Sequence, residues 1–220
     1  MKALISALLG ATMLAVALTP TASAAAVSQG AYGSATWITG PFDFDGHTGA
    51  YQQLYLFLNQ ERIRGSEGAF DRRCYYYVDT IYLPDPSGAG GEPLRQTASS
   101  GCIPDPQFSA SLDVVTLPTV TISTHTWAWT DGVPSQPIPG TLTLAFELTA
   151  LGPWAEPLHM ESCYDMTYPC ANTVTRLRPA SAELWIDGMS AGLPTYAGIV
   201  WGIAIWPCLI SDPSTCEPPS

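Results

Sequence analysis

The pentapeptide GMSAG at residues 188–192 matches GxSxG, the turn that presents a nucleophilic serine in α/β-hydrolases. Acyl transfer at such a site needs a helix after the serine and a histidine base that follows it in the chain. Pro194 stands where the helix should run, and all three histidines precede Ser190. We therefore interpret the pentapeptide as a turn after a strand, without a catalytic role.

Metal chemistry has equally little support in the sequence. Asp43 and Asp45 precede Gly46 as in part of a calcium loop, but the further oxygen ligands and the distal glutamate of an EF-hand are missing. No CxxC pair occurs, and the histidines lie far apart in the chain, so a zinc site is not expected. We predict that the protein has no metal and no cofactor.

The tryptophans are the residues that favour a binding role. His125, Trp127 and Trp129 alternate along one predicted strand and therefore share a face, and Trp185 lies in another predicted strand. On a solvated face these four residues would form an aromatic platform on which a flat sugar could stack. The alternative is that a second layer of structure buries them, which is the commoner fate of large aromatic side chains.

The cysteines indicate disulfides. Their number is even, and an exported protein meets an oxidising environment. Sequence alone does not select among the fifteen possible connectivities. We predict bonds between sequential pairs of the six residues, Cys74–Cys102, Cys163–Cys170 and Cys208–Cys216.

The first 24 residues have the layout of a secretory signal peptide. One lysine precedes an apolar run, and small residues end at Ala24. The remaining chain has 7 arginines and 19 acidic residues, a net charge of −12, which disfavours nucleic acid and anionic membranes as partners. We expect a secreted protein with no membrane span in its mature chain.

The elements that must position these residues are strands. Residues 141–151, TLTLAFELTAL, alternate apolar and polar side chains, as in a strand with one buried face. Residues 119–151 are expected to form an antiparallel hairpin with a proline-rich tip, and Pro118 is expected to mark a boundary or a bulge. Strands are also predicted at residues 73–83, 182–187 and 197–206.

Other segments are harder to assign. Residues 51–64 fit either a strand or one face of a helix, and we predict a strand. Residues 85–109 are rich in Pro, Gly, Ser and Asp, which predicts a long loop, and residues 151–179 are expected to be irregular.

Strands without alternating helices predict an all-β fold, an antiparallel β-sandwich with long Pro/Gly-rich loops held by disulfides, or alternatively a β-barrel. The expected organisation is a signal peptide (1–24), a flexible leader (25–34), one β-rich domain (35–210) and a polar tail (211–220).

No coherent catalytic set emerges, so the sequence favours a non-catalytic binding or structural module of the cell exterior, whose partner would be an extracellular protein or a glycan. Two alternatives stay open. One is a secreted polysaccharide hydrolase, since 19 acidic residues could include the pair of carboxylates that such an enzyme needs. The other is a carbohydrate-binding module that uses the tryptophan face.

Overall fold

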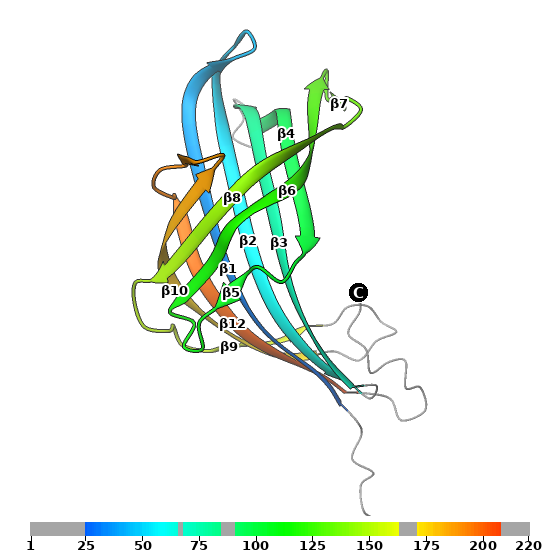
Figure 1. Cartoon of the computed structure of the whole chain (residues 1–220), viewed down its shortest axis with the longest axis vertical. Helices are drawn as coiled ribbons and strands as arrows, with labels where there is room; N and C mark the ends of the chain where they lie inside the picture. Colours follow the sequence, from blue (N-terminus) through cyan, green and yellow to red (C-terminus); the bar gives the residue numbers. More distant parts are fainter. Residues whose placement is uncertain (1–24, 66–67, 85–90, 163–170, 208–220) are drawn as a thin grey trace, which may run out of the picture.

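The described chain is built from β-strands alone. The structure, a computed structural model, describes residues 25–65, 68–84, 91–162 and 171–207 (Figure 1). Within these ranges no helix has the length and hydrophobicity needed to cross a membrane. Eight strands are long: β1 (Ala25–Phe44), β2 (His47–Gly65), β3 (Gly68–Pro84), β4 (Gly91–Cys102), β6 (Val114–Thr130), β8 (Ile138–Ala150), β10 (Ala171–Ile186) and β12 (Tyr196–Pro207). Four are short: β5 (Gln107–Phe108), β7 (Val133–Pro134), β9 (Leu158–Ser162) and β11 (Met189–Ser190).

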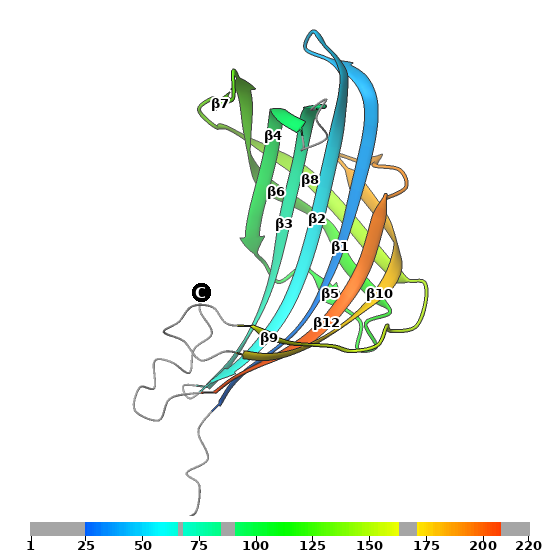
Figure 2. The same ribbon diagram turned by 180° about the vertical axis from the view of Figure 1, so that it is seen from behind.

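All strand pairings are antiparallel, and those of the long strands run in a ring. The order β10-β12-β1-β2-β3-β4-β6 is completed by β8, which pairs with both β6 and β10. Seen from one side, β6 and β8 cross in front of β1, β2 and β3, and the reverse view brings β1 to β3 forward (Figures 1 and 2). The predicted all-β antiparallel class is confirmed. The long strands form one cyclic sheet, so the pairing corresponds to a closed sheet rather than to two separately paired sheets.

The core lies inside this ring. The register that pairs Leu148 with Val115 and Ala182 also directs Leu144 and Phe146 inward, and all three of these β8 side chains are buried. From the opposite wall β2 contributes Leu56 and Leu58, and Trp37 contacts Phe146 edge-on with ring centroids 6.2 Å apart. The predicted buried face of residues 141–151 is therefore confirmed, as is the strand assignment of residues 51–64.

Three Asp-Gly dipeptides make the tightest reversals. Asp45-Gly46, Asp131-Gly132 and Asp187-Gly188 have positive φ at both residues, as in the two-residue turns that match the twist of a β-hairpin. They join β1 to β2, β6 to β7 and β10 to β11. Pro118 lies at a register shift between Leu117 and Val120, which confirms the expected irregularity, and β6 and β8 form the predicted hairpin.

The long loop predicted for residues 85–109 is wrong in its middle part, because residues 91–102 form β4. Composition was misleading there because small residues are needed opposite large ones. Gly101 faces the ring of Tyr75, and the Ser99 hydroxyl lies 3.0 Å from the Tyr75 hydroxyl. Pro93 lies at a register shift in the β3–β4 ladder, the kind of position that tolerates a proline within a sheet.

Two more predictions need correction. Ala25–Ser34 belongs to β1 and pairs with both β2 and β12, so it is not a loose leader. Residues 171–179, expected to be irregular, are the first part of β10, and Pro179 lies where the pairing of β10 with β12 ends and that with β8 begins. The predicted signal peptide (1–24) and the predicted polar tail (211–220) lie outside the described residues.

One disulfide is present among the described residues. Cys74 and Cys102 lie directly opposite each other in the β3–β4 ladder and are bonded across 28 residues of chain, which confirms this predicted pair. The other four cysteines, Cys163, Cys170, Cys208 and Cys216, lie outside the described residues.

A buried arginine contacts the segment between β5 and β6, which lies toward the lower end of the ring in Figure 1. Arg178 is 5% exposed, and its guanidinium binds Asp113 at 2.9 Å and donates to the carbonyl oxygens of Ser111 and Leu112. The same guanidinium lies 4.4 Å above the ring of Trp154, a favourable cation–π distance. One side chain thus ties the segment between β5 and β6 and the segment between β8 and β9 to β10.

The close approach of β1 to β8 predicts that Gly33→Ala is destabilising. A β-carbon at Gly33 would collide with Leu148 Cδ1 and lie 3.3 Å from Val115 Cγ1, and both of those side chains are fully buried. We expect a loss of about 1–3 kcal/mol in the free energy of unfolding, measured by chemical denaturation. Gly152→Ala is the control, because its β-carbon would meet only Pro179 at 3.7 Å. Equal stability of the two variants would contradict this packing.

Candidate functional site

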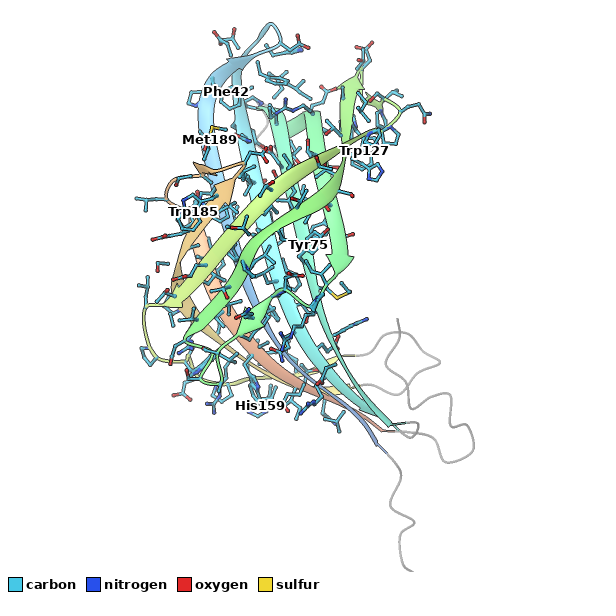
Figure 3. The ribbon with its side chains drawn as sticks, in the orientation of Figure 1. Phe42, Tyr75, Trp127, His159, Trp185 and Met189 are labelled. Carbon is cyan, nitrogen blue, oxygen red and sulfur yellow. A yellow bond between two sulfur atoms is a disulfide. The ribbon has the colours of Figure 1, made fainter. Side chains whose placement is uncertain are left out.

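An open cavity of about 520 Å³, which we call the mouth, lies at the upper end of the ring, where Figure 3 labels its lining residue Met189. That volume is typical of a site for a small molecule. Its walls come from β1, β2, β3, β4, β6, β8, β10 and β11. The apolar part of the lining consists of Trp37, Leu54, Tyr77, Leu142, Ile186, Met189 and Ala191. The polar part consists of Thr39, Gln52, Asp79, Arg95, Thr97, Thr124, Thr126, Thr141 and Ser190.

The apolar lining continues directly into the core. Trp37 and Leu54 face each other across the β1–β2 ladder, and each is at most 5% exposed. The Trp37 indole donates a hydrogen bond of 3.0 Å to the Gly192 carbonyl oxygen, which fixes the ring at the side of the cavity. The mouth therefore has a rigid hydrophobic floor, suited to the apolar part of a ligand.

Asp79 is a carboxylate on an otherwise hydrophobic inner row of β3. It lies opposite Leu54 and follows Tyr75 and Tyr77 on the same face. Its Oδ1 accepts a hydrogen bond of 2.7 Å from the Gln52 amide. Burial raises the pKa of Asp79, while the Gln52 hydrogen bond and the charge of Arg95 oppose that rise. The carboxyl group of Asp79 thus lies in a partly desolvated position, hydrogen-bonded to Gln52.

Arg95 supplies the opposite charge from the neighbouring strand. Its guanidinium carbon lies 5.1 Å from the centre of the ring of Phe44, the last residue of β1. The positive charge lowers the pKa of Asp79 through space, without a hydrogen bond between the two side chains. In residues 25–65, 68–84, 91–162 and 171–207, the Arg95 guanidinium forms no hydrogen bond or ion pair.

Hydroxyl groups complete the wall. Thr97 and Thr126 share a hydrogen bond of 2.9 Å between β4 and β6, and Thr124 is buried beside them. Tyr77 is 1% exposed, and burial raises its pKa, with the charges of Asp79 and Asp187 adding to the effect. The phenol therefore stays neutral over the physiological range and can serve as a hydrogen-bonding group only.

The predicted binding residues lie elsewhere, on the outer face of the ring. His125 and Trp127 are neighbours there, with ring centroids 6.1 Å apart, and Trp127 and Trp129 are both partly exposed. Trp185 and His125 both lie beside β8, where Trp185 pairs with Ala145 and His125 pairs with Pro139. Those two β8 residues are six positions apart, which is about 20 Å along the strand. Figure 3 likewise shows Trp127 and Trp185 well apart. The four residues do not form a single platform.

The GMSAG segment borders the mouth as a turn and a short strand. Met189 pairs with Ile186, and the Ser190 hydroxyl accepts a hydrogen bond of 3.1 Å from the Gly192 amide. Met189 lies at the mouth end of the molecule, and His159 lies at the other end (Figure 3). No histidine lines the mouth in the part of the chain that the structure describes. This geometry gives Ser190 no base and agrees with a turn.

Sequence reasoning missed both charged residues of the mouth. For Asp79 a signal existed, since the alternation of RCYYYVDTIYL places a carboxylate on the same face as Tyr75, Tyr77 and Ile81. A charge on a buried face is a functional signal. The sequence gives no such signal for Arg95, because the composition of residues 85–109 predicts a loop, in which a side chain cannot be assigned to a face.

A second hollow, of about 590 Å³, lies at the lower end and is less suited to specific binding. Its lining is mainly apolar, with Leu112, Trp154 and Trp201 among its members. Its polar members include His159 and Arg176, and the buried Arg178 near it is bound to Asp113 and to backbone carbonyls. The mouth is the better candidate site, because its lining combines a carboxylate with a guanidinium, whereas the described residues that line the second hollow include no carboxylate. Among the described residues, no group of three or more His, Cys, Asp or Glu could hold a metal.

The raised pKa of Asp79 predicts that Asp79→Asn stabilises the protein at neutral pH. The folded state binds the Asp79 proton more tightly than the unfolded state does. The free energy of unfolding therefore falls as the pH rises from the pKa of Asp79 in the unfolded chain to its higher pKa in the folded protein. The variant should have the higher thermal midpoint at pH 7, and the difference should shrink below pH of about 4.

The matched control for this measurement is Asp113→Asn. Hydrogen bonds from Ser111 and Arg178 lower the pKa of Asp113, so its replacement should reduce the thermal midpoint at pH 7. The two variants thus have opposite expected signs. A lower thermal midpoint for Asp79→Asn than for the wild type at pH 7 would show that the Asp79 carboxylate does not destabilise the fold.

Comparisons of the chain with protein-family models, curated proteins and solved structures find no match. A functional assignment therefore has to come from the chemistry of the chain itself. In the described residues that chemistry is concentrated in the mouth, where a hydrophobic floor meets one carboxylate and one guanidinium.

Proposed function

We propose that this chain is a secreted, non-catalytic binding module of the cell exterior that takes a small amphiphilic molecule in the mouth. One observation carries the proposal. Asp79 and Arg95 project into a cavity with a hydrophobic floor, and each is positioned by a partner other than the opposite charge. Placing charges in a partly buried cavity without direct pairing is unfavourable for folding, and such groups are typical of binding sites.

The signal-like start of the chain and its disulfide support export. The cyclic sheet supports the binding role, because the end of a closed sheet is a common place for a ligand. A polysaccharide hydrolase is less well supported, since such an enzyme uses a pair of carboxyl groups. Among the described residues that line the mouth, Asp79 is the one carboxylate.

A direct test uses 1-anilinonaphthalene-8-sulfonate, a fluorescent probe with aromatic rings and one anionic group. We expect one probe per chain, with emission that increases on binding, because the floor takes the rings and Arg95 takes the sulfonate. Arg95→Gln should weaken binding about tenfold, the effect of losing one charged hydrogen-bonding partner.

The control is Arg72→Gln, which removes a guanidinium that binds Glu61 outside the mouth. This variant should bind the probe like the wild type, and both variants should keep the wild-type thermal transition. Absence of binding to the wild type, or equal binding by Arg95→Gln and Arg72→Gln, would contradict a ligand site in the mouth.

A second candidate function is glycan binding on the outer face, which the contact between His125 and Trp127 and the partial exposure of Trp129 favour. Replacing both Trp127 and Trp129 with alanine should then abolish sedimentation of the protein with insoluble cellulose or chitin and leave the thermal transition intact. Unchanged sedimentation, or none in the wild type, would argue against this role. A lost transition would show that the two rings are structural.

A further inference from the structure

The two charges of the mouth have a defined spatial relation. In the β3–β4 ladder Asp79 lies opposite Thr97, and Arg95 lies opposite Ile81. Asp79 and Arg95 are therefore diagonal neighbours on the inner face of adjacent strands, with α-carbons about 7–8 Å apart. That spacing lets one small molecule contact both side chains at once.

Asp79 and Arg95 each have polar groups that can still bind a ligand in the cavity. The Gln52 amide occupies one oxygen of Asp79, and within the described residues no hydrogen bond involves the other. The Phe44 ring covers one face of the Arg95 guanidinium, which leaves the N–H groups at its edge for a planar acceptor. The site thus offers an acceptor for a cation and a fork of donors for a carboxylate, side by side.

A ligand with a single charge would satisfy only half of this arrangement. An anion alone would pair with Arg95 and leave Asp79 partly desolvated beside it, and an amine alone would do the same to Arg95. Sites that bind polar groups reject analogues that leave a buried partner unpaired. The hydrophobic floor of Trp37, Leu54 and Leu142 adds a third requirement, an apolar group on the same molecule.

Building on the proposed function, we propose that the mouth binds a zwitterionic α-amino acid with an apolar side chain. Its ammonium group lies against Asp79, its carboxylate lies against the Arg95 guanidinium, and its side chain lies on the floor beside Trp37. The threonine hydroxyls of β4 and β6 border the polar end. A cavity of about 520 Å³ has room for a single ligand as large as phenylalanine.

The test compares L-phenylalanine with three analogues by calorimetric titration of the full chain. 2-Phenylethylamine lacks the carboxylate, 3-phenylpropanoate lacks the amine, and glycine lacks the side chain. We expect L-phenylalanine to bind at least about tenfold more tightly than each analogue, because each one leaves one of the three parts of the site unsatisfied.

Two substitutions assign the charges. Arg95→Gln should remove the preference over 2-phenylethylamine, and Asp79→Asn should remove the preference over 3-phenylpropanoate. Arg95→Gln should still prefer L-phenylalanine over 3-phenylpropanoate, and Asp79→Asn should still prefer it over 2-phenylethylamine. Arg72→Gln is the control and should keep both preferences, since its guanidinium binds Glu61 away from the mouth.

The inference is overturned if L-phenylalanine binds no more tightly than the analogues with one charge, or if each substitution weakens all compounds equally. The naphthalene sulfonate probe separates this failure from that of the proposed function. Probe binding that depends on Arg95, without a preference for the zwitterion, would leave the mouth as a ligand site and refute the amino-acid assignment. Loss of both would refute both.

Discussion

The pairing of β8 with strands on both of its sides is the constraint on which the rest of this structure depends. β8 bonds to β6 along one edge and to β10 along the other, and these ladders close the cyclic order of the long strands. Closure pairs the backbone groups that an edge strand would leave exposed. It also gives every long strand an inner and an outer face, so a side chain reaches the core or the mouth only if its register places it inward.

The two ends of the ring differ because their inward residues differ. At the lower end Arg178 is buried, bound to Asp113 and stacked on Trp154, so its charge contributes to packing. At the upper end Asp79 and Arg95 stand in the cavity without a bond between them. The first arrangement fixes two loops to β10, and the second is the basis of the ligand site proposed above.

Much of the fold could be predicted from alternation along the chain. The period of two at residues 141–151 identified a strand and its buried face, and Pro118 correctly marked an irregularity. The class and the β6–β8 hairpin followed from such local signals, and the Cys74–Cys102 bond followed from pairing the cysteines in sequence order. β4 could not be predicted in this way, because the side chains that Gly101 and Ser99 accommodate belong to Tyr75 on another strand. The candidate site was missed for the same reason, since Asp79 and Arg95 meet only through the β3–β4 register.

The sequence by itself determined the strands whose apolar and polar residues alternate, such as residues 141–151, and which of their faces are apolar, because this alternation lies in neighbouring residues. It also determined where the chain reverses at the Asp-Gly turns, since their backbone conformation is a local preference. Only the tertiary structure decided that the strands close into a ring, that the Trp127 and Trp185 rings lie apart, and that one carboxylate and one guanidinium face the same cavity. Those relations depend on pairings between distant strands, and no local pattern encodes which strand will be the neighbour.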